Sequence, residues 1–211
     1  MKKMLLSGIS CLLMAALAQA QISKGSIMLG GSITGGSSKQ GLAQELKQNS
    51  IGIAPTVGIA IKENTIAGVE LFYGNNTTKQ SPNKVDNDNY GAGVFVRKYL
   101  SLGRSFYLFG QPGIFFNHAR TRYISNTSLG KSLSTGITAR FYPGISFAAT
   151  KRFHLECGLP NLVQVGLSRN KNYDAADVLT DKSTSMNFSV SASSFSAISF
   201  GFRVFLTKQP G

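Results

Sequence analysis

The sequence predicts an all-β fold: an eight-stranded antiparallel up-and-down transmembrane β-barrel with short periplasmic turns and long external loops. Three observations predict it. The chain opens with an export signal, and no later stretch approaches the ~20 apolar residues of a membrane-spanning helix. Eight segments of alternating apolar residues are joined by connections that are alternately long and short. An exported chain that lies in a bilayer without such helices must pair its backbone groups in a closed barrel.

Residues 1–20 have the three parts of a secretory signal peptide. Lys2 and Lys3 give a positive start, Met4–Leu17 is apolar, and Ala18–Ala20 is a cleavage site of the small-x-small type. We therefore expect residues 1–20 to be removed and residues 21–211 to form a single outer-membrane β-barrel domain.

The two cysteines bear on this processing. Cys11 leaves lipid attachment open as an alternative, although Gly8 stands where a lipoprotein signal has an aliphatic residue. After cleavage only Cys157 remains, so no disulfide can form within the mature chain.

Each of the first four predicted strands has apolar side chains at every second residue, as a strand with one dry face does. These strands cover residues 25–34, 51–62, 66–74 and 90–100. Pro55 interrupts the second of them, which predicts a bulge or a missing ladder hydrogen bond. The predicted apolar faces carry Ile27, Leu29, Ile33, Ile51, Ile53, Val57, Ile59, Ile61, Val69, Leu71, Tyr73, Ala92, Val94 and Val96.

The last four predicted strands show the same period. They cover residues 106–118, 136–149, 153–168 and 197–206. Their apolar faces carry Leu108, Ile114, Phe116, Ile137, Phe141, Ile145, Phe147, Leu155, Cys157, Leu159, Ile198, Phe200, Phe202, Val204 and Leu206.

The connections between these strands differ strongly in length. Polar stretches at 35–49, 75–89, 119–135 and 169–193 alternate with short turns at 62–65, 101–105 and 150–152. An even number of strands with short turns at one end is typical of bacterial outer-membrane barrels. A soluble exported barrel is the alternative, but it has no reason to keep its short turns at one end.

The final strand, 197–206, carries a further signal. Ser199, Gly201, Val204 and Leu206 resemble the C-terminal insertion signal of outer-membrane barrels, a polar residue followed by Gly and two alternating apolar positions. With this ending, Phe95–Tyr99 and Pro143–Ser146, the mature chain resembles the outer membrane protein β-barrel domain family, the small OmpA-type barrels of Gram-negative bacteria. The resemblance implies an outer-membrane location and insertion by the barrel-assembly machinery, which reads the C-terminal strand.

The opposite faces of the strands collect charge in the middle of the barrel. An eight-stranded barrel is only wide enough for side chains to fill it, and unpaired buried ions cost several kcal/mol each. We therefore expect one ion-paired network that plugs the lumen, with Tyr107 and Asn117 satisfying leftover donors; a proton- or ion-conducting path is the alternative. The predicted network consists of Glu70, Arg97, Gln111, Arg140, Glu156 and Arg203.

The net charge of +13 does not predict nucleic-acid binding, because the chain is exported and has no basic helix or aromatic-basic motif. Basic residues near the short turns suit a surface of lipid headgroups. At the other end, Arg120, Arg122 and Lys131 are candidates for contact with lipopolysaccharide phosphates or an acidic ligand, the alternative being a merely solvated loop. Outer-membrane lipids and lipopolysaccharide are thus the expected partners.

Two motif-like strings and the two histidines do not predict catalysis or metal binding. Gly130–Ser132 lacks the first Gly of a P-loop, and Asp86–Gly91 departs from a calcium loop at its fifth position. His118 and His154 lie at opposite ends of the predicted barrel and cannot share a site. We expect no catalytic residue, no metal and no cofactor.

The function that the sequence favours is therefore that of a non-enzymatic outer-membrane barrel with a closed lumen. Its role would be structural, or an interaction of the external loops with an unknown ligand. Two alternatives stay open: a narrow pore for small solutes or ions, and a lipid-modifying outer-membrane enzyme.

Overall fold

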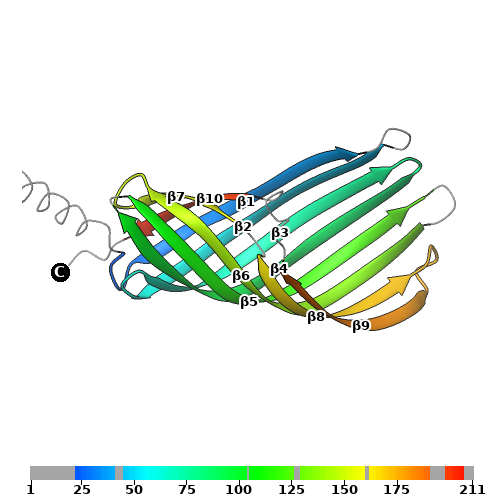
Figure 1. The fold of residues 1–211 in the computed structure, drawn as a ribbon. Coiled ribbons are helices and arrows are strands. Elements are labelled where there is room, and N and C mark those ends of the chain that lie inside the picture. The colour runs from blue at the N-terminus through cyan, green and yellow to red at the C-terminus, as the bar shows by residue number, and fades with distance from the viewer. Residues whose placement is uncertain are drawn as a thin grey trace, which may run out of the picture.

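The computed structural model describes residues 22–40, 45–103, 105–125, 129–159, 162–190 and 198–206. The predicted signal peptide lies outside these ranges. Within them no helix is long and apolar enough to cross a membrane. The strands are β1 (Ile27–Gln40), β2 (Leu46–Lys62), β3 (Thr65–Gln80), β4 (Asn83–Gly103), β5 (Phe106–Ile124), β6 (Leu129–Ala148), β7 (Phe153–Gly158), β8 (Val163–Tyr173), β9 (Leu179–Val190) and β10 (Ser199–Leu206) (Figure 1).

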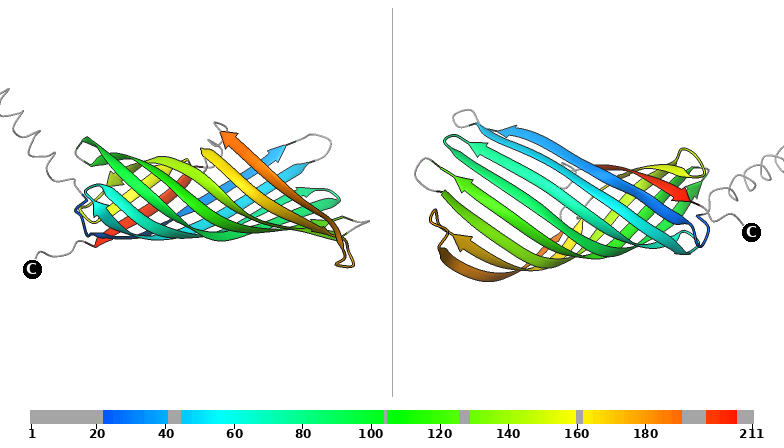
Figure 2. Two further views of the ribbon diagram at one scale, coloured as in Figure 1. Left: turned by 90° about the horizontal axis from the view of Figure 1, so that it is seen from below. Right: turned by 180° about the vertical axis from the view of Figure 1, so that it is seen from behind.

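These ten strands form one antiparallel ring (Figure 2). β7 and β8 share the position beside β6, and β9 and β10 share the next, which gives eight positions. Each of β1 to β6 pairs with the next along the chain. β7 pairs with the end of β6 at Gly144–Ala148, and β8 with its beginning at Lys131–Phe141, so β7 and β8 together form the predicted seventh strand. β10 pairs with both β7 and β1, and its partnership with β1 closes the ring from Ile27↔Leu206 to Thr34↔Ser199. The all-β, eight-stranded antiparallel prediction is confirmed.

The polar stretches expected to be external loops are mostly paired strand. β3 and β4 remain paired up to Gln80↔Asn83, and β8 and β9 up to Tyr173↔Leu179. The predicted strand ends were therefore wrong, and the reason is physical. A neighbouring strand supplies ladder hydrogen bonds whatever the side chains are, whereas apolar alternation persists only as far as the wall contacts an apolar medium.

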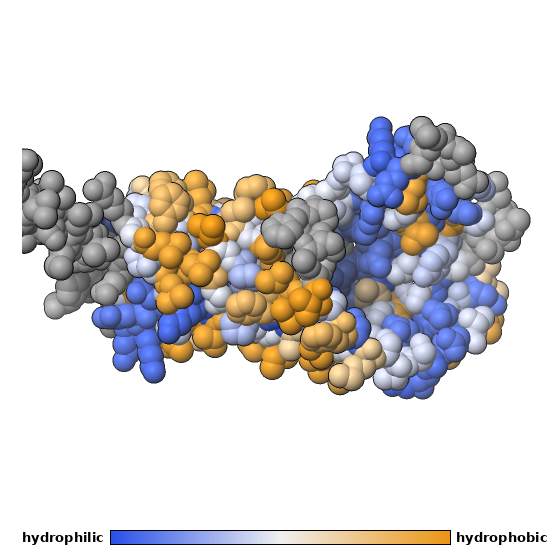
Figure 3. Space-filling view, in the orientation of Figure 1, coloured by the Kyte–Doolittle hydropathy of each residue, from blue (hydrophilic) through white to orange (hydrophobic). Residues whose placement is uncertain are grey.

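The outer wall carries an apolar belt near the short-turn end (Figure 3). Val69 and Phe202, for example, are 47% and 48% exposed on this wall. Cys157 is also exposed. Farther along the strands the surface becomes hydrophilic, and we call this polar end, formed by the strand extensions, the outer rim.

A proline and a glycine, Pro55 and Gly30, shape the wall locally. The β2–β3 ladder passes from Ile53↔Tyr73 to Thr56↔Glu70 and omits Pro55, so the predicted break at this proline is confirmed. At Gly30, a Cβ atom would lie 2.8 Å from Cδ of Arg203. Gly30 thus leaves room for the aliphatic part of Arg203 to enter the lumen.

Candidate functional site: the lumen and the outer rim

The centre of the lumen is an ion pair between β4 and β7. Arg97 Nη1 lies 2.8 and 2.6 Å from the two carboxylate oxygens of Glu156, and the Tyr99 hydroxyl donates to Glu156 Oε1 at 2.7 Å. From β10, Arg203 Nη2 lies 3.2 Å from Glu156 Oε2. Arg97 and Arg203 are 0% and 1% exposed, so one carboxylate neutralises two buried guanidinium groups only in part. Arg203 also donates from Nη1 to the carbonyl oxygen of Gly31 at 2.6 Å.

A second ion pair lies on the outer-rim side of the first and joins Arg140 of β6 to Glu70 of β3. Gln111 of β5 connects the two pairs. Its carbonyl oxygen accepts from Arg97 Nε at 2.7 Å, and its amide nitrogen donates to Glu70 Oε2 at 3.3 Å. The structure therefore brings all six residues predicted for the lumen into one connected network.

The supporting side chains differ from those expected. Tyr107 packs on His154, with ring centroids 5.5 Å apart, and Asn117 accepts a hydrogen bond from Thr138. Their place beside the charges is taken by Tyr99 and by aromatic rings. The Arg97 guanidinium lies 4.4 Å from the centre of the Phe109 ring. Tyr99 could have been found from the sequence, because it follows Arg97 by two residues and so points to the same side.

Between this network and the short-turn end, the lumen is packed with apolar and aromatic side chains. Met28 and Ile66 are completely buried, and Tyr99, Tyr107 and Phe109 are each 1% exposed. The N-terminal segment closes over them: the Ile22 backbone N–H donates to Asn64 Oδ1 at 3.0 Å, and the Asn64 N–H donates back to the Ile22 carbonyl. The lower half of the barrel is therefore a solid core.

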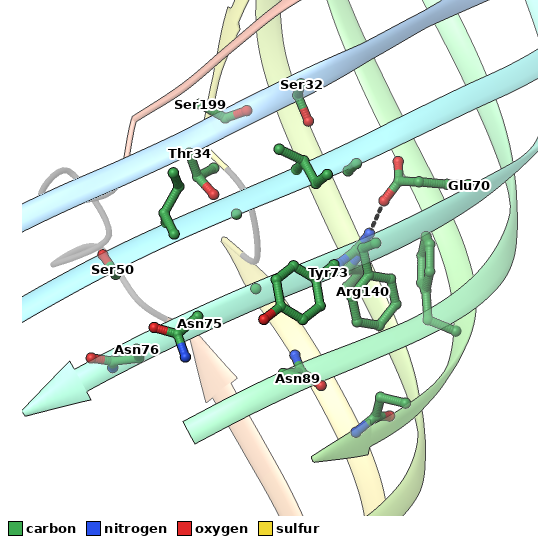
Figure 4. Close-up of a pocket in the computed structure, with 18 of the residues that line it drawn as sticks. Ser32, Thr34, Ser50, Glu70, Tyr73, Asn75, Asn76, Asn89, Arg140 and Ser199 are labelled. Carbon is green, nitrogen blue, oxygen red and sulfur yellow. Dashed lines mark hydrogen bonds and ion pairs between the residues drawn. The ribbon is translucent and has the colours of Figure 1, made fainter. Parts of the chain in front are cut away.

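The outer half of the lumen is hollow. A cavity of about 610 Å³ opens toward the rim, with the Glu70–Arg140 pair at its inner end (Figure 4). Among the described residues, the Oδ1 atoms of Asn76 and Asn89 are buried without a hydrogen-bond partner. We call this space the vestibule. Hydroxyl and amide side chains line it, among them Ser32, Thr34, Ser50, Asn76, Asn89 and Ser199.

The two histidines lie far apart in the strand register, as expected. His118 pairs across the ladder with Tyr90 and Thr135 near the outer rim, and its Nδ1 lies 2.9 Å from Thr135 Oγ1. His154 lies near the short turns, where its Nδ1 is 3.2 Å from Ser146 Oγ. Sequence reasoning missed this Ser–His contact because the two residues belong to adjacent strands. Ser146 is fully buried and His154 is 3% exposed, so the pair has no access for a substrate.

The two strings that resemble ligand-binding loops are parts of strands. Gly130–Ser132 lies in β6, where no helix follows to present its N-terminus to a phosphate. Asp86 lies in β4, where it pairs with Lys84 at 2.6 Å and accepts a hydrogen bond from Thr77 at 2.8 Å.

The three basic residues expected at an anionic surface share the outer wall beside the rim. Arg120, Arg122 and Lys131 line one groove together with Tyr73, Tyr90 and His118. Two of the three are already paired: Arg122 lies 3.0 Å from Asp88, and Lys131 lies 2.6 Å from Asp177. Of these cations, Arg120 alone has no ion pair with any described residue.

No protein-family model matches the sequence, and no curated protein matches it. Among solved structures, the chain is similar to the translocator domain of the autotransporter NalP from Neisseria meningitidis, with 14% identity and a TM-score of 0.50 over 89% of this chain and 66% of that one. It is also similar to Neisserial surface protein A (16% identity, TM-score 0.45, 86% and 99% covered). A third is the outer membrane protein OprG from Pseudomonas aeruginosa (13%, 0.46, 90% and 99%).

The fold is that of an outer-membrane β-barrel. In such a barrel the apolar belt contacts lipid, the short turns face the periplasm and the extended strands face the exterior. In this chain the vestibule lies at the end with the extended strands, and the packed lower half of the lumen lies at the short-turn end.

Proposed function

We propose that this protein is a non-enzymatic outer-membrane barrel with a closed lumen, and that it serves a structural or surface-interaction role through its outer rim. The observation that carries the proposal is the Glu156 network. It connects β4, β7 and β10 across the lumen, and each of its charged groups is at most 3% exposed.

Passage of an ion would require this network to open. The permeating ion would have to separate Arg97 from Glu156 and displace the packed rings of Tyr99 and Phe109. Removing one partner of a buried ion pair costs roughly 3–5 kcal/mol, and separating the two groups in place leaves both charges without a partner, so an open state is rare at equilibrium. A narrow pore is therefore the less favoured function.

The vestibule is the better candidate for interaction with a molecule outside the cell. Its charged groups, Glu70 and Arg140, neutralise each other, and the rest of its polar lining consists of hydroxyl and amide groups. Such a lining suits an uncharged polar ligand that both donates and accepts hydrogen bonds. The unpartnered Oδ1 atoms of Asn76 and Asn89 would accept from it.

Planar-bilayer recording tests the closed lumen. The unmodified protein should show no steady conductance. Because packed rings still fill the lumen once the ion pair is lost, the variant that should conduct combines Arg97→Ser and Glu156→Ser with Tyr99→Ser and Phe109→Ser. The matched control is Arg122→Ser with Asp88→Ser, which removes an ion pair from the outer wall and should leave the barrel closed.

A steady open conductance of the unmodified protein would favour the pore function instead. Turnover of lipid A by the purified protein would favour the lipid-modifying enzyme.

A further inference from the structure

A second groove runs along the outer wall, over β5, β6 and β8, and reaches β9. Its volume is about 790 Å³, and the part within the apolar belt is lined by side chains that alternate outward from these strands. Ile114 and Leu167 are each 58% exposed there. The apolar lining consists of Ile114, Phe116, Ile137, Ala139, Val165 and Leu167.

The groove exists because one small outward-facing residue, Ala139, interrupts a wall of larger ones. Ala139 lies in register between Ile114 of β5 and Val165 of β8, so a single methyl group stands between two branched side chains. The result is a trough that is open toward the hydrocarbon of the membrane.

The trough ends at two cations. Arg169 follows Leu167 by two residues on the same face of β8, a rise of about 7 Å along the strand. Lys182 of β9 also lines this end, together with the hydroxyl-bearing Thr184. Both cations are exposed, and neither forms an ion pair with any described residue, in contrast to Arg122 and Lys131 in the neighbouring groove. Two unneutralised positive charges therefore lie at the top of an apolar trough.

We propose that this groove binds a phosphorylated lipid of the outer leaflet, with an acyl chain in the trough and a phosphate between Arg169 and Lys182. Because Arg169 and Lys182 are unpaired cations, the complementary headgroup is anionic. The apolar trough directly below indicates a lipid, because a free phosphate has no apolar surface to bury against Ile137 or Leu167. The position also fits, since the cations stand at the border between the apolar belt and the hydrophilic rim. This inference is independent of whether the lumen conducts.

Binding is tested with the full mature chain refolded in detergent, by native mass spectrometry with three probes: bis-phosphorylated lipid A, dephosphorylated lipid A and phosphatidylcholine. Phosphorylated lipid A should bind most tightly. Arg169→Ser with Lys182→Ser should weaken its binding by about 25-fold, because each basic group near a lipid phosphate contributes about fivefold. The same double variant should bind dephosphorylated lipid A as the unmodified protein does.

Ala139→Trp fills the trough and should weaken both forms of lipid A. The control, Lys39→Ser with Lys79→Ser, removes the same charge from the outer rim far from the groove and should change nothing. Faster migration of unheated samples on SDS gels shows that each variant has folded.

Three results would overturn the proposal. The first is equal binding of phosphorylated lipid A by the unmodified protein and the Arg169→Ser, Lys182→Ser variant. The second is an Ala139→Trp variant that folds and binds both lipids undiminished. The third is complete displacement of lipid A by inorganic phosphate, which would mean that the cations bind free phosphate and the trough has no role.

Discussion

Removing the charge of Glu156 is the sharpest test of the lumen network. Glu156→Gln keeps the shape of the side chain, so no cavity forms, but Arg97 and Arg203 lose the carboxylate that both of them contact. They are 0% and 1% exposed and cannot turn to water. The other carboxylate of the network, Glu70, is already paired with Arg140.

The expected cost is about 3–5 kcal/mol of unfolding free energy, the usual penalty for removing one partner of a buried ion pair. Neutralising an arginine as well should recover part of it. The double variant Glu156→Gln with Arg203→Met should therefore be more stable than the sum of the single effects by roughly 2 kcal/mol, within the range of coupled contacts.

The measurement is urea unfolding of the protein in lipid vesicles, followed by the gel mobility of unheated samples. The chain has no tryptophan, so fluorescence would depend on tyrosine alone. Glu63→Gln, at the exposed turn between β2 and β3, is the control and should be neutral. A cost for Glu156→Gln below about 1 kcal/mol, together with additivity with Arg203→Met, would refute the buried network, since coupled contacts are not additive.

Two further predictions concern the outer wall and the rim. Val69→Arg, in the apolar belt near the bilayer midplane, should lower the unfolding free energy by about 2–4 kcal/mol in the same assay. Lys79→Arg, farther along the same face of β3, should leave it unchanged. Equal effects of the two substitutions would mean that the belt does not contact lipid. At the rim, the hydrogen bond from Lys84, and then that from Thr77, lowers the pKa of Asp86 below its ordinary value of 3.8. Because this pKa is lowered in the folded state, the stabilisation is complete above about pH 4 and is lost as the pH falls through the lowered value. Measured relative to its cleavage of an unstructured peptide at each pH, pepsin should cut the β3–β4 hairpin faster as the pH drops below 4. Asp86→Asn should remove that dependence, and an unchanged relative pH profile in this variant would exclude Asp86 as the cause.

The sequence by itself determined which side of the wall each residue occupies. Strand side chains alternate strictly, so Val69 and Glu70 must point to opposite faces wherever the strand lies. The same rule placed Arg97, Glu156 and Arg203 in the lumen. Ring closure followed from the absence of spanning helices together with eight alternating segments, and the structure has this ring.

The tertiary structure decided the level that each residue occupies along the barrel. Alternation says nothing about register, which depends on the turns, on the bulge between Ala60 and Lys62 and on the closure of β10 against β1. Register is what brings Glu156 to Arg97, 59 residues away, and Ser146 to His154.

Register also decided how far the strands extend and where the outer-wall groove lies. Polar residues at 75–89 contain no apolar period, yet β3 and β4 remain paired through them because ladder hydrogen bonds join backbone atoms. The trough at Ala139 likewise depends on three strands from different parts of the chain meeting at one level. A local pattern specifies the face of a strand, whereas a contact between strands requires the closed barrel.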